Sequence, residues 1–349
     1  MPVPPPNLPN HDTRPRDRYG RALRDLRISV TDRCNFRCAY CMPKEVFGPD
    51  HVFLPDHAVL SDDEILRLAR AFTRAGVSKL RITGGEPLMR ARLPELIAQL
   101  AKLPEAADLS LTTNGWMLAR LAPELAAAGL HRVNVSLDAL DDAIFGRMNG
   151  RRFGAGRVLE GIEAAIAAGL GVKINMVVQR GVNETQVLPM ARHFRERGIT
   201  LRFIEYMDVG NCNGWRMDQV VPALEIIAMI HAEHALEPVD PGYHGEVAAR
   251  YRYSGTTTEI GIISSVTEPF CSACHRARLS ADGKLFTCLF ANQGTDLRAA
   301  MRSGMDDEAL YALICRVWGA RVDRYSDERA ELLARGEHPE RIEMSYIGG

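Results

Sequence analysis

The chain has 349 residues, of which 46% are hydrophobic, and its formal net charge at pH 7 is −1. This length accommodates one large α/β domain or two unequal domains with a full hydrophobic core. The sequence has no uncharged apolar run of about 18 residues, so no membrane span is expected. The near-neutral charge argues against non-specific nucleic-acid binding, although local basic clusters can still hold a small anion.

Residues 1–18 are rich in proline and arginine and lack the apolar stretch of a secretory signal. Their composition predicts a flexible arm, and the absence of a signal predicts a cytoplasmic location. In a reducing compartment, clustered cysteines are metal ligands more often than disulfide partners. Six of the eight cysteines fall into two tight groups. Both groups are therefore candidate metal sites.

From Leu26 onward, apolar β-rich runs alternate with amphipathic helical runs. Ser61 and Glu64 have the spacing of a capping box, and Gly169 suits the end of a helix. The six expected strands span residues 26–31, 79–85, 109–115, 132–139, 172–179 and 199–207. The expected helices between them span residues 61–76, 94–103, 121–128, 158–169 and 186–197.

Six strands separated by helices predict right-handed crossovers and a parallel sheet. The expected fold class is α/β, with an incomplete (β/α)6 barrel over residues 19–219, because the pattern stops near residue 210. The strand ends carry the segments TDRC, TGGE, TTNG, SLDA and EYMD. In such sheets the chemistry gathers at these ends.

The sequence changes character in residues 220–349, which are expected to form a C-terminal α+β extension that closes one side of the barrel. A helix near 222–234 precedes short β candidates over 244–290. Two further helices, near 296–303 and 306–317, come before a polar tail.

The first cysteine group follows the first expected strand directly. Cys34, Cys38 and Cys41 have a C-x₃-C-x₂-C spacing within TDRCNFRCAYCMP. Three thiolates on one short loop can hold a [4Fe–4S] cluster and leave its fourth iron open to the amino and carboxylate groups of a small molecule. A zinc loop or three simply buried cysteines are the alternatives, but closed structural zinc needs a fourth ligand that this loop lacks.

The second group consists of Cys271, Cys274 and Cys288, in a C-x₂-C-x₁₃-C arrangement. A second [4Fe–4S] cluster with an open iron would offer a Lewis acid to a nitrogen or oxygen of a substrate. Zinc is the main alternative here, although His275 is a poor fourth ligand because it directly follows a cysteine of the group. Cys212 and Cys315 lie outside both groups and are expected to be structural.

The first spacing, with an aromatic residue before its last cysteine, resembles the radical S-adenosylmethionine superfamily. The GGEP segment, residues 84–87, strengthens the resemblance, because glycine at a strand end lets the backbone approach a charged amino group. In that superfamily the segment contacts the methionine part of S-adenosylmethionine. The resemblance implies cofactor contacts from Tyr40, Gly85, Ser136 and Met207. Spacing alone would instead favour ordinary packing at the strand ends for Ser136 and Met207.

Two cysteine triads narrow the resemblance to the GTP 3′,8-cyclase family of molybdenum cofactor biosynthesis. It covers the chain from about Gly20 to Gly349 and rests on RDLRISVTDRCNFRCAYCMP, LRITGGEPLMR, NVSLDA, RFIEYMDVG, CSACHRARLS and SYIGG. The family implies two [4Fe–4S] clusters and S-adenosylmethionine as cofactors. A 5′-deoxyadenosyl radical would remove the C3′ hydrogen of GTP, and the ribose radical would attack C8 of guanine. The family also implies a flavodoxin or ferredoxin as electron donor. The product would pass to cyclic pyranopterin monophosphate synthase, and the chain could form a homodimer.

A triphosphate needs convergent cations, for which arginine is well suited. Arg276 and Arg278 alternate on one face of a candidate strand beside the second cysteine group, so both can point into the barrel. The resemblance assigns GTP contacts to Arg27, Arg81, Thr112, Lys173, Arg276 and Arg278. For any single arginine, a solvated charge or a structural ion pair is the alternative.

The chain ends in Gly348 and Gly349, which by composition would be a frayed end. In the resembling family the terminal diglycine reaches the active site and is required for turnover. The resemblance therefore implies catalytic roles for both glycines. It further implies that Arg276 or Arg278 gives electrostatic support, or a proton, to the aminyl radical formed on the purine after attack at C8, although an arginine is a poor acid.

Two other functions remain open at this point. The first is another two-cluster radical enzyme that acts on a different substrate such as a peptide, although such relatives usually carry more cysteines in the C-terminal region. The second is a non-catalytic zinc-binding interaction protein, which would have no need for the polar clusters at the strand ends.

Overall fold

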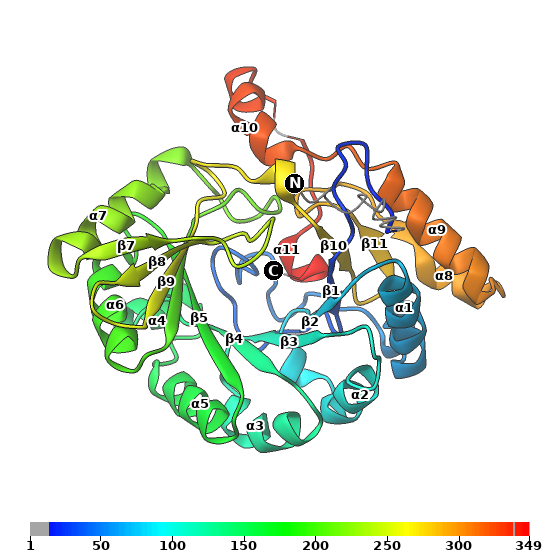
Figure 1. Cartoon of the computed structure of the whole chain (residues 1–349), viewed down its shortest axis with the longest axis horizontal. Coiled ribbons are helices and arrows are strands. Elements are labelled where there is room, and N and C mark those ends of the chain that lie inside the picture. The colour runs from blue at the N-terminus through cyan, green and yellow to red at the C-terminus, as the bar shows by residue number, and fades with distance from the viewer. Residues whose placement is uncertain (1–13, 338, 349) are drawn as a thin grey trace, which may run out of the picture.

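The computed structural model describes residues 14–337 and 339–348. All six predicted strands are present and pair in parallel, in chain order. They are β1 (Asp25–Ser29), β2 (Lys79–Thr83), β3 (Asp108–Thr113), β4 (Arg132–Ser136), β5 (Gly171–Val178) and β6 (Thr200–Glu205). The strands curve around a central space, and the helices lie on the outer side (Figure 1). The prediction of an α/β fold with a parallel sheet is confirmed.

The predicted helices between these strands are also confirmed. They are α1 (Asp62–Arg74), α2 (Leu93–Leu100), α3 (Leu118–Ala127), α5 (Gly156–Ala167) and α6 (Val187–Glu196). The Ser61–Glu64 capping box is formed at the start of α1. One further helix, α4 (Asp142–Met148), was not predicted, because it is short and contains a glycine. Asp141 caps α4 by accepting a hydrogen bond from the Ile144 amide.

The C-terminal extension adds six strands to the same sheet. They are β7 (Leu236–Val239), β8 (Ala249–Tyr253), β9 (Glu259–Ile263), β10 (Arg276–Leu279), β11 (Lys284–Phe286) and β12 (Thr295–Asp296). β9 pairs in parallel with β6, and β10 pairs in parallel with β1. The extension therefore covers both edges of the first six strands, which corrects the expectation that it closes one side. Both edges carry backbone groups that need partners.

The described sheet has the order β12-β11-β10-β1-β2-β3-β4-β5-β6-β9-β8-β7 and is open between β12 and β7. Three predicted helices of the extension are present: α7 (Ala223–Glu233), α8 (Leu297–Arg302) and α9 (Asp307–Gly319). The segment expected to be a polar tail contains two helices that were not predicted, α10 (Tyr325–Ala334) and α11 (Met344–Ile347). α11 lies near the centre of the barrel (Figure 1).

The N-terminal arm is shorter than its composition predicts. Residues 1–13 lie outside the described residues, but Asp17 is buried, and its carboxylate pairs with Arg21 at 2.5 Å and with Arg321 at 3.4 Å. The buried ion pairs of Asp17 therefore attach this part of the predicted arm to the rest of the fold. Among the described residues, no helix combines the length and apolar character needed to cross a bilayer.

The strands alternate between the helix-covered core and the central space. In β1, Leu26 and Ile28 are completely buried in the core, whereas Arg27 between them lines a central cavity. The sheet register places Arg27 directly beside Arg81 of β2 and Arg278 of β10. The alternation of single residues along parallel strands thus brings three arginines from distant segments into one row.

Candidate active site

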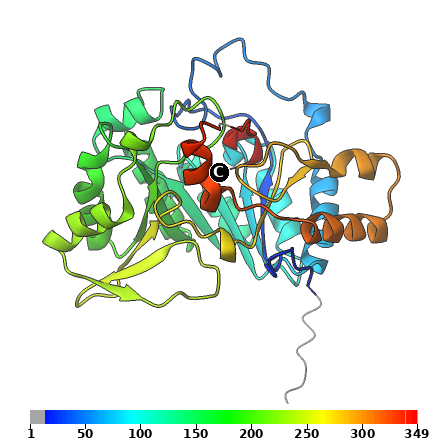
Figure 2. The ribbon, with the colours of Figure 1, turned by 90° about the horizontal axis from the view of Figure 1, so that it is seen from above.

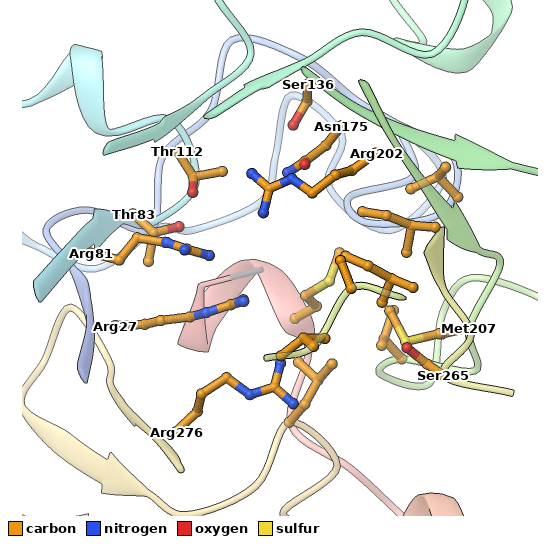
Figure 3. Close-up of a pocket in the computed structure, with 18 of the residues that line it drawn as sticks. Arg27, Arg81, Thr83, Thr112, Ser136, Asn175, Arg202, Met207, Ser265 and Arg276 are labelled. Atoms are coloured by element: carbon orange, nitrogen blue, oxygen red, sulfur yellow. The ribbon is translucent and has the colours of Figure 1, made fainter. Parts of the chain in front are cut away.

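The central cavity has a volume of about 510 Å³. All six cysteines of the two triads line it, and so do the other predicted site residues apart from the terminal glycines. Arg27, Arg81, Arg202 and Arg276 point into the same space (Figure 3). The structure therefore brings the predicted site residues together from both halves of the chain.

The first triad lies at the carboxyl ends of the parallel strands. Cys34, Cys38 and Cys41 occupy the loop after β1, and burial raises the pKa of all three thiols. Burial, then the Glu86 carboxylate, raises the pKa of Cys34 to about 12. Without a positive metal centre these thiols stay protonated at neutral pH, so the loop gathers thiols in a setting where a metal would supply the compensating charge.

The GGEP segment packs directly against the cysteine loop. The amide of Gly85 donates to the carbonyl of Thr31 at 2.8 Å, and the amide of Glu86 donates to the carbonyl of Arg33 at the same distance. A Cβ on Gly85 would lie 2.3 Å from the Arg33 carbonyl oxygen, so only glycine fits there. Glycine is therefore needed here to pack the GGEP segment against the cysteine loop, and Gly85 also lines the central cavity.

Tyr40 has a fixed position beside the first triad. Its hydroxyl donates to the Asp138 carboxylate at 2.8 Å, and that carboxylate also accepts from the Val177 amide at 2.9 Å. Burial raises the pKa of Asp138 to about 6. Ser136, at the end of β4, and Met207, just after β6, also line the cavity (Figure 3). Asp138 was not among the predicted site residues, although it belongs to the SLDA segment.

The second triad lies at the opposite end of the strands. Cys271 and Cys274 precede β10, which is parallel to β1, and Cys288 follows β11, which is antiparallel to β10. Burial alone would raise the pKa of the Cys274 thiol, but Arg276 and Arg321 lower it to about 6. Arg276 donates to the Cys274 sulfur at 3.6 Å. This thiolate is therefore available as a ligand at neutral pH.

Several cations that have no carboxylate partner among the described residues lie between the two triads, and of these Arg276 is paired with the Cys274 sulfur. Burial, then the neighbouring Arg278 and Arg81, lowers the pKa of Arg27. Within residues 14–337 and 339–348, no carboxylate lies within 4 Å of a charged nitrogen of the cavity cations Arg27, Arg81, Lys173, Arg202, Arg276 and Arg278. Buried cations without anions repel one another, so the binding of a polyanion would relieve this repulsion.

Arg202 and Asn175 complete this surface and were missed by the sequence analysis. They are neighbours in the register of β5 and β6. Nε of Arg202 and Oδ1 of Asn175 are buried with no hydrogen-bond partner in the described structure, as is Nε of Arg81. Strand alternation was a signal that could have found Arg202, since buried Leu201 and Phe203 flank it.

The C-terminal tail reaches the same cavity. The buried Arg278 donates from Nη1 to the carbonyl oxygen of Gly348. Gly348 has a φ of 75°, and a Cβ there would lie 2.3 Å from Cγ2 of Thr83. Gly349 lies outside the described residues. Composition alone would make this tail a frayed end, but Gly348 is enclosed between the ends of β1 and β2.

Comparison with known proteins agrees with this arrangement. The radical SAM superfamily profile matches residues 28–194, and the molybdenum cofactor synthesis C profile matches residues 199–327. The S-adenosylmethionine-bound structure of SuiB from Streptococcus suis covers 84% of this chain and 68% of its own, with a TM-score of 0.59 and 14% identity. That likeness supports the fold alone.

Sequence relatives are much closer. A GTP 3′,8-cyclase from Acidothermus cellulolyticus is 52% identical over 357 aligned positions, covering 96% of this chain and 99% of the relative. GTP 3′,8-cyclases from Staphylococcus saprophyticus and Staphylococcus carnosus are 49% and 51% identical, each covering 95% of this chain and 98% of the relative. The chain therefore belongs to the GTP 3′,8-cyclase family of the radical S-adenosylmethionine superfamily.

Proposed function

We propose that this chain converts GTP into 3′,8-cyclo-7,8-dihydro-GTP, the first step of molybdenum cofactor biosynthesis. The observation that carries the proposal is the row of unpaired cations between two cysteine triads. A triphosphate is a strong match for such a row, because its oxygens can accept bidentate hydrogen bonds from several arginines. A peptide substrate, the alternative for a two-cluster radical enzyme, would not need this concentration of positive charge.

The residues around the first triad fit a [4Fe–4S] cluster and S-adenosylmethionine, the cofactors that the superfamily implies. When bound, these groups supply a 5′-deoxyadenosyl radical through one-electron cleavage of a carbon–sulfur bond. Cys34, Cys38 and Cys41 would hold the cluster. Gly85 offers its backbone at close range, and Asp138 holds Tyr40 in place beside the cysteines. Ser136 and Met207 would contact the S-adenosylmethionine from the strand ends.

We assign a second [4Fe–4S] cluster to Cys271, Cys274 and Cys288. Zinc is the rival, but a closed structural zinc site needs a fourth ligand beyond these three cysteines. The Nδ1 atom of His275 is engaged with the Ala22 carbonyl, and a Cβ on Gly245 would lie 2.4 Å from its Nε2 atom. His275 is thus enclosed on both sides, so a ligand for the cluster's fourth iron would have to come from the cavity, where the guanine of GTP would lie.

The cavity cations would hold the rest of the nucleotide. Arg27 and Arg81 adjoin in the register, and Thr112 and Lys173 both neighbour Asn134 of β4. We assign Arg27, Arg81, Thr112 and Lys173 to the triphosphate and ribose, and add Arg202 on the strength of its unpartnered Nε. With the phosphates fixed, C3′ and C8 would be held near each other in a cavity that excludes bulk water.

The tail would close the cavity over the nucleotide. Arg278 holds Gly348 at the ends of β1 and β2, which are also the strands that carry Arg27 and Arg81. We propose that Gly348 and Gly349 complete the catalytic site, and that Arg276 and Arg278 stabilise charge that develops on the purine. The cyclised nucleotide would pass to a pterin-forming enzyme, cyclic pyranopterin monophosphate synthase.

GTP affinity should fall as the pH rises through about 8. Burial, then Arg202 and Arg132, lowers the pKa of Lys173 to about 8. Below this pH the ammonium is charged and attracts the triphosphate, and above it the charge is lost. We expect the Kd for GTP, measured by anaerobic equilibrium dialysis, to rise severalfold between pH 7 and pH 9. Loss of the Lys173 charge would remove one charge-assisted hydrogen bond to the triphosphate, which contributes about 1.5–3 kcal/mol. Lys173→Arg should flatten this dependence, and an equally steep Lys173→Arg profile would rule out Lys173 as its source.

The direct test of the function is anaerobic incubation with GTP, S-adenosylmethionine and dithionite, followed by identification of the nucleotide product. Reconstituted protein should contain about eight irons per chain if both triads hold four-iron clusters. Cys288→Ala should lower this to about four and remove GTP cyclisation, while 5′-deoxyadenosine is still formed. Cys315→Ala, on α9 outside both triads, is the matched control. Stoichiometric zinc in the second site of anaerobically purified protein would defeat the second-cluster assignment.

A further inference from the structure

The surface beside the first cysteine triad carries exposed arginines without counterions. Arg147, Arg151, Arg152 and Arg157 lie between the end of α4 and the first turn of α5, and all four are exposed. Across residues 14–337 and 339–348, no carboxylate lies within 4 Å of any of their guanidinium nitrogens. Exposed arginines on the outer helices are commonly paired instead, as the 2.5 Å contact between Arg74 and Glu308 shows.

This basic segment packs directly onto the cysteine loop. The amide of Arg37 donates to the carbonyl of Asn149 at 2.9 Å, and Nε of Arg151 donates to the carbonyl of Asn35 at 3.1 Å. A Cβ on Gly150 would lie 2.0 Å from the Arg37 carbonyl oxygen, so no side chain separates the two loops. The four arginines therefore lie on the segment that packs against the loop carrying the first triad.

A projecting loop borders the same surface. Residues 42–60 follow Cys41 and extend beyond the strand ends, as the blue loop at the top of Figure 2 shows. Nε of Arg37 ties this loop to the cysteines by donating to the carbonyl of Phe47 at 2.6 Å. Val46 and Val52 on the loop are 51% and 88% exposed. Lys44 adds a positive charge, and Glu45 and Asp50 are the nearby acids along the loop.

We propose that this surface, formed by residues 42–53 and 147–157, docks an acidic one-electron carrier protein. Arg37 contacts both segments, and their exposed apolar side chains and arginines without carboxylate partners in the described structure match a small, weak interface with an acidic partner, as is common for electron-transfer complexes. The proposal rests on the proposed function, because the first cluster must gain one electron in each turnover. The carrier loses that electron and the cluster gains it, so no bond or proton is exchanged.

The arrangement favours a protein carrier over a small diffusible reductant. A chain with a net charge of −1 has no overall attraction for an anion, so the local excess of arginines supplies the steering. The nearby acids are partly engaged, since Asp142 accepts from the Ala155 amide and Asp141 caps α4. An acidic carrier that presents its redox group beside its carboxylates would bring that group to the cysteine loop.

The test compares two reductants with the same enzyme. Arg147→Glu with Arg152→Glu reverses two charges that touch neither triad. With an acidic flavodoxin reduced by NADPH and its reductase, the rate of 5′-deoxyadenosine formation should fall about tenfold or more. With dithionite the rate should stay within about twofold of the native value, since a small reductant needs no docking. Native activity with flavodoxin should also fall as NaCl is raised from 50 to 300 mM.

Arg70→Glu with Lys102→Glu is the matched control. Both residues are exposed and lie near the carboxyl ends of α1 and α2, at the opposite end of the strands from the first triad. Equal flavodoxin-driven rates in the native protein and the 147/152 variant would overturn the proposal. If that variant also lost dithionite-driven activity, Lys44→Glu with Val52→Asp on the projecting loop would decide the question. Failure of the proposed function would look different, because dithionite would then yield no cyclised nucleotide even in the native protein.

Discussion

The Cys38→Ala variant should form no 5′-deoxyadenosine above background, with either GTP present or GTP omitted. Cys38 lies between the other two cysteines of its loop, and its thiol is buried beside theirs. The loop supplies three protein ligands for four irons, so losing one would leave two irons without a protein ligand. We expect iron content after reconstitution to fall from about eight to about four per chain, with the second triad still loaded.

Two controls make this result specific. Cys315→Ala should keep full iron content and full 5′-deoxyadenosine formation. Cys288→Ala should lose the same amount of iron as Cys38→Ala but keep the cleavage of S-adenosylmethionine, because its triad lies at the other end of the strands. If Cys38→Ala still cleaved S-adenosylmethionine at a rate similar to that of Cys288→Ala, the first triad would not be the cleavage site.

The sequence was sufficient to predict the six inner strands because each is a short apolar run bounded by polar strand ends. The arrangement of the extension was not predictable in this way. β10, β11 and β12 have four, three and two residues, too few for a periodic pattern. Nothing local in these runs reveals that β10 pairs with β1 while β9 pairs with β6. Those pairings join segments that are more than 50 residues apart.

The candidate site likewise contains residues that the sequence predicted and residues that it did not. The cysteines and GGEP were found because their spacing has few structural explanations, whereas Asp138 acts through a contact with Tyr40, 98 residues away. Residues 325–341 were expected to be a polar tail because they are rich in charged side chains, some of which are buried in ion pairs. Arg329 is buried and pairs with Asp208 at 2.9 Å, and Arg341 pairs with the same carboxylate at 3.1 Å. A buried ion cluster looks like solvated surface in the sequence alone.

Replacing Arg278 with glutamine should lower GTP cyclisation by about thirtyfold or more and leave S-adenosylmethionine cleavage largely intact. The reason is the loss of a charge-assisted hydrogen bond to the Gly348 carbonyl, worth about 2 kcal/mol. Gly348→Ala should have a comparable effect, since its Cβ would clash with Thr83 and its φ is left-handed. Both variants should therefore form more 5′-deoxyadenosine per cyclised nucleotide than the native protein. Arg298→Gln, at the start of α8, is the control and should leave this ratio unchanged.

A double-mutant cycle separates the two roles proposed for Arg278. If Arg278 acts by holding the tail, the Arg278→Gln/Gly348→Ala double variant should be no worse than the more damaged single variant, because either change already releases Gly348. If Arg278 instead contacts the nucleotide independently of the tail, the two losses in kcat/KM should multiply. The contact of the Arg278 guanidinium with the Gly348 carbonyl favours coupling, although Arg278 also lies beside Arg27 in the row proposed to hold GTP. A cycle with fully multiplicative losses would assign Arg278 to the substrate alone and leave the tail held by Ser345 and Ile347, which are buried in α11.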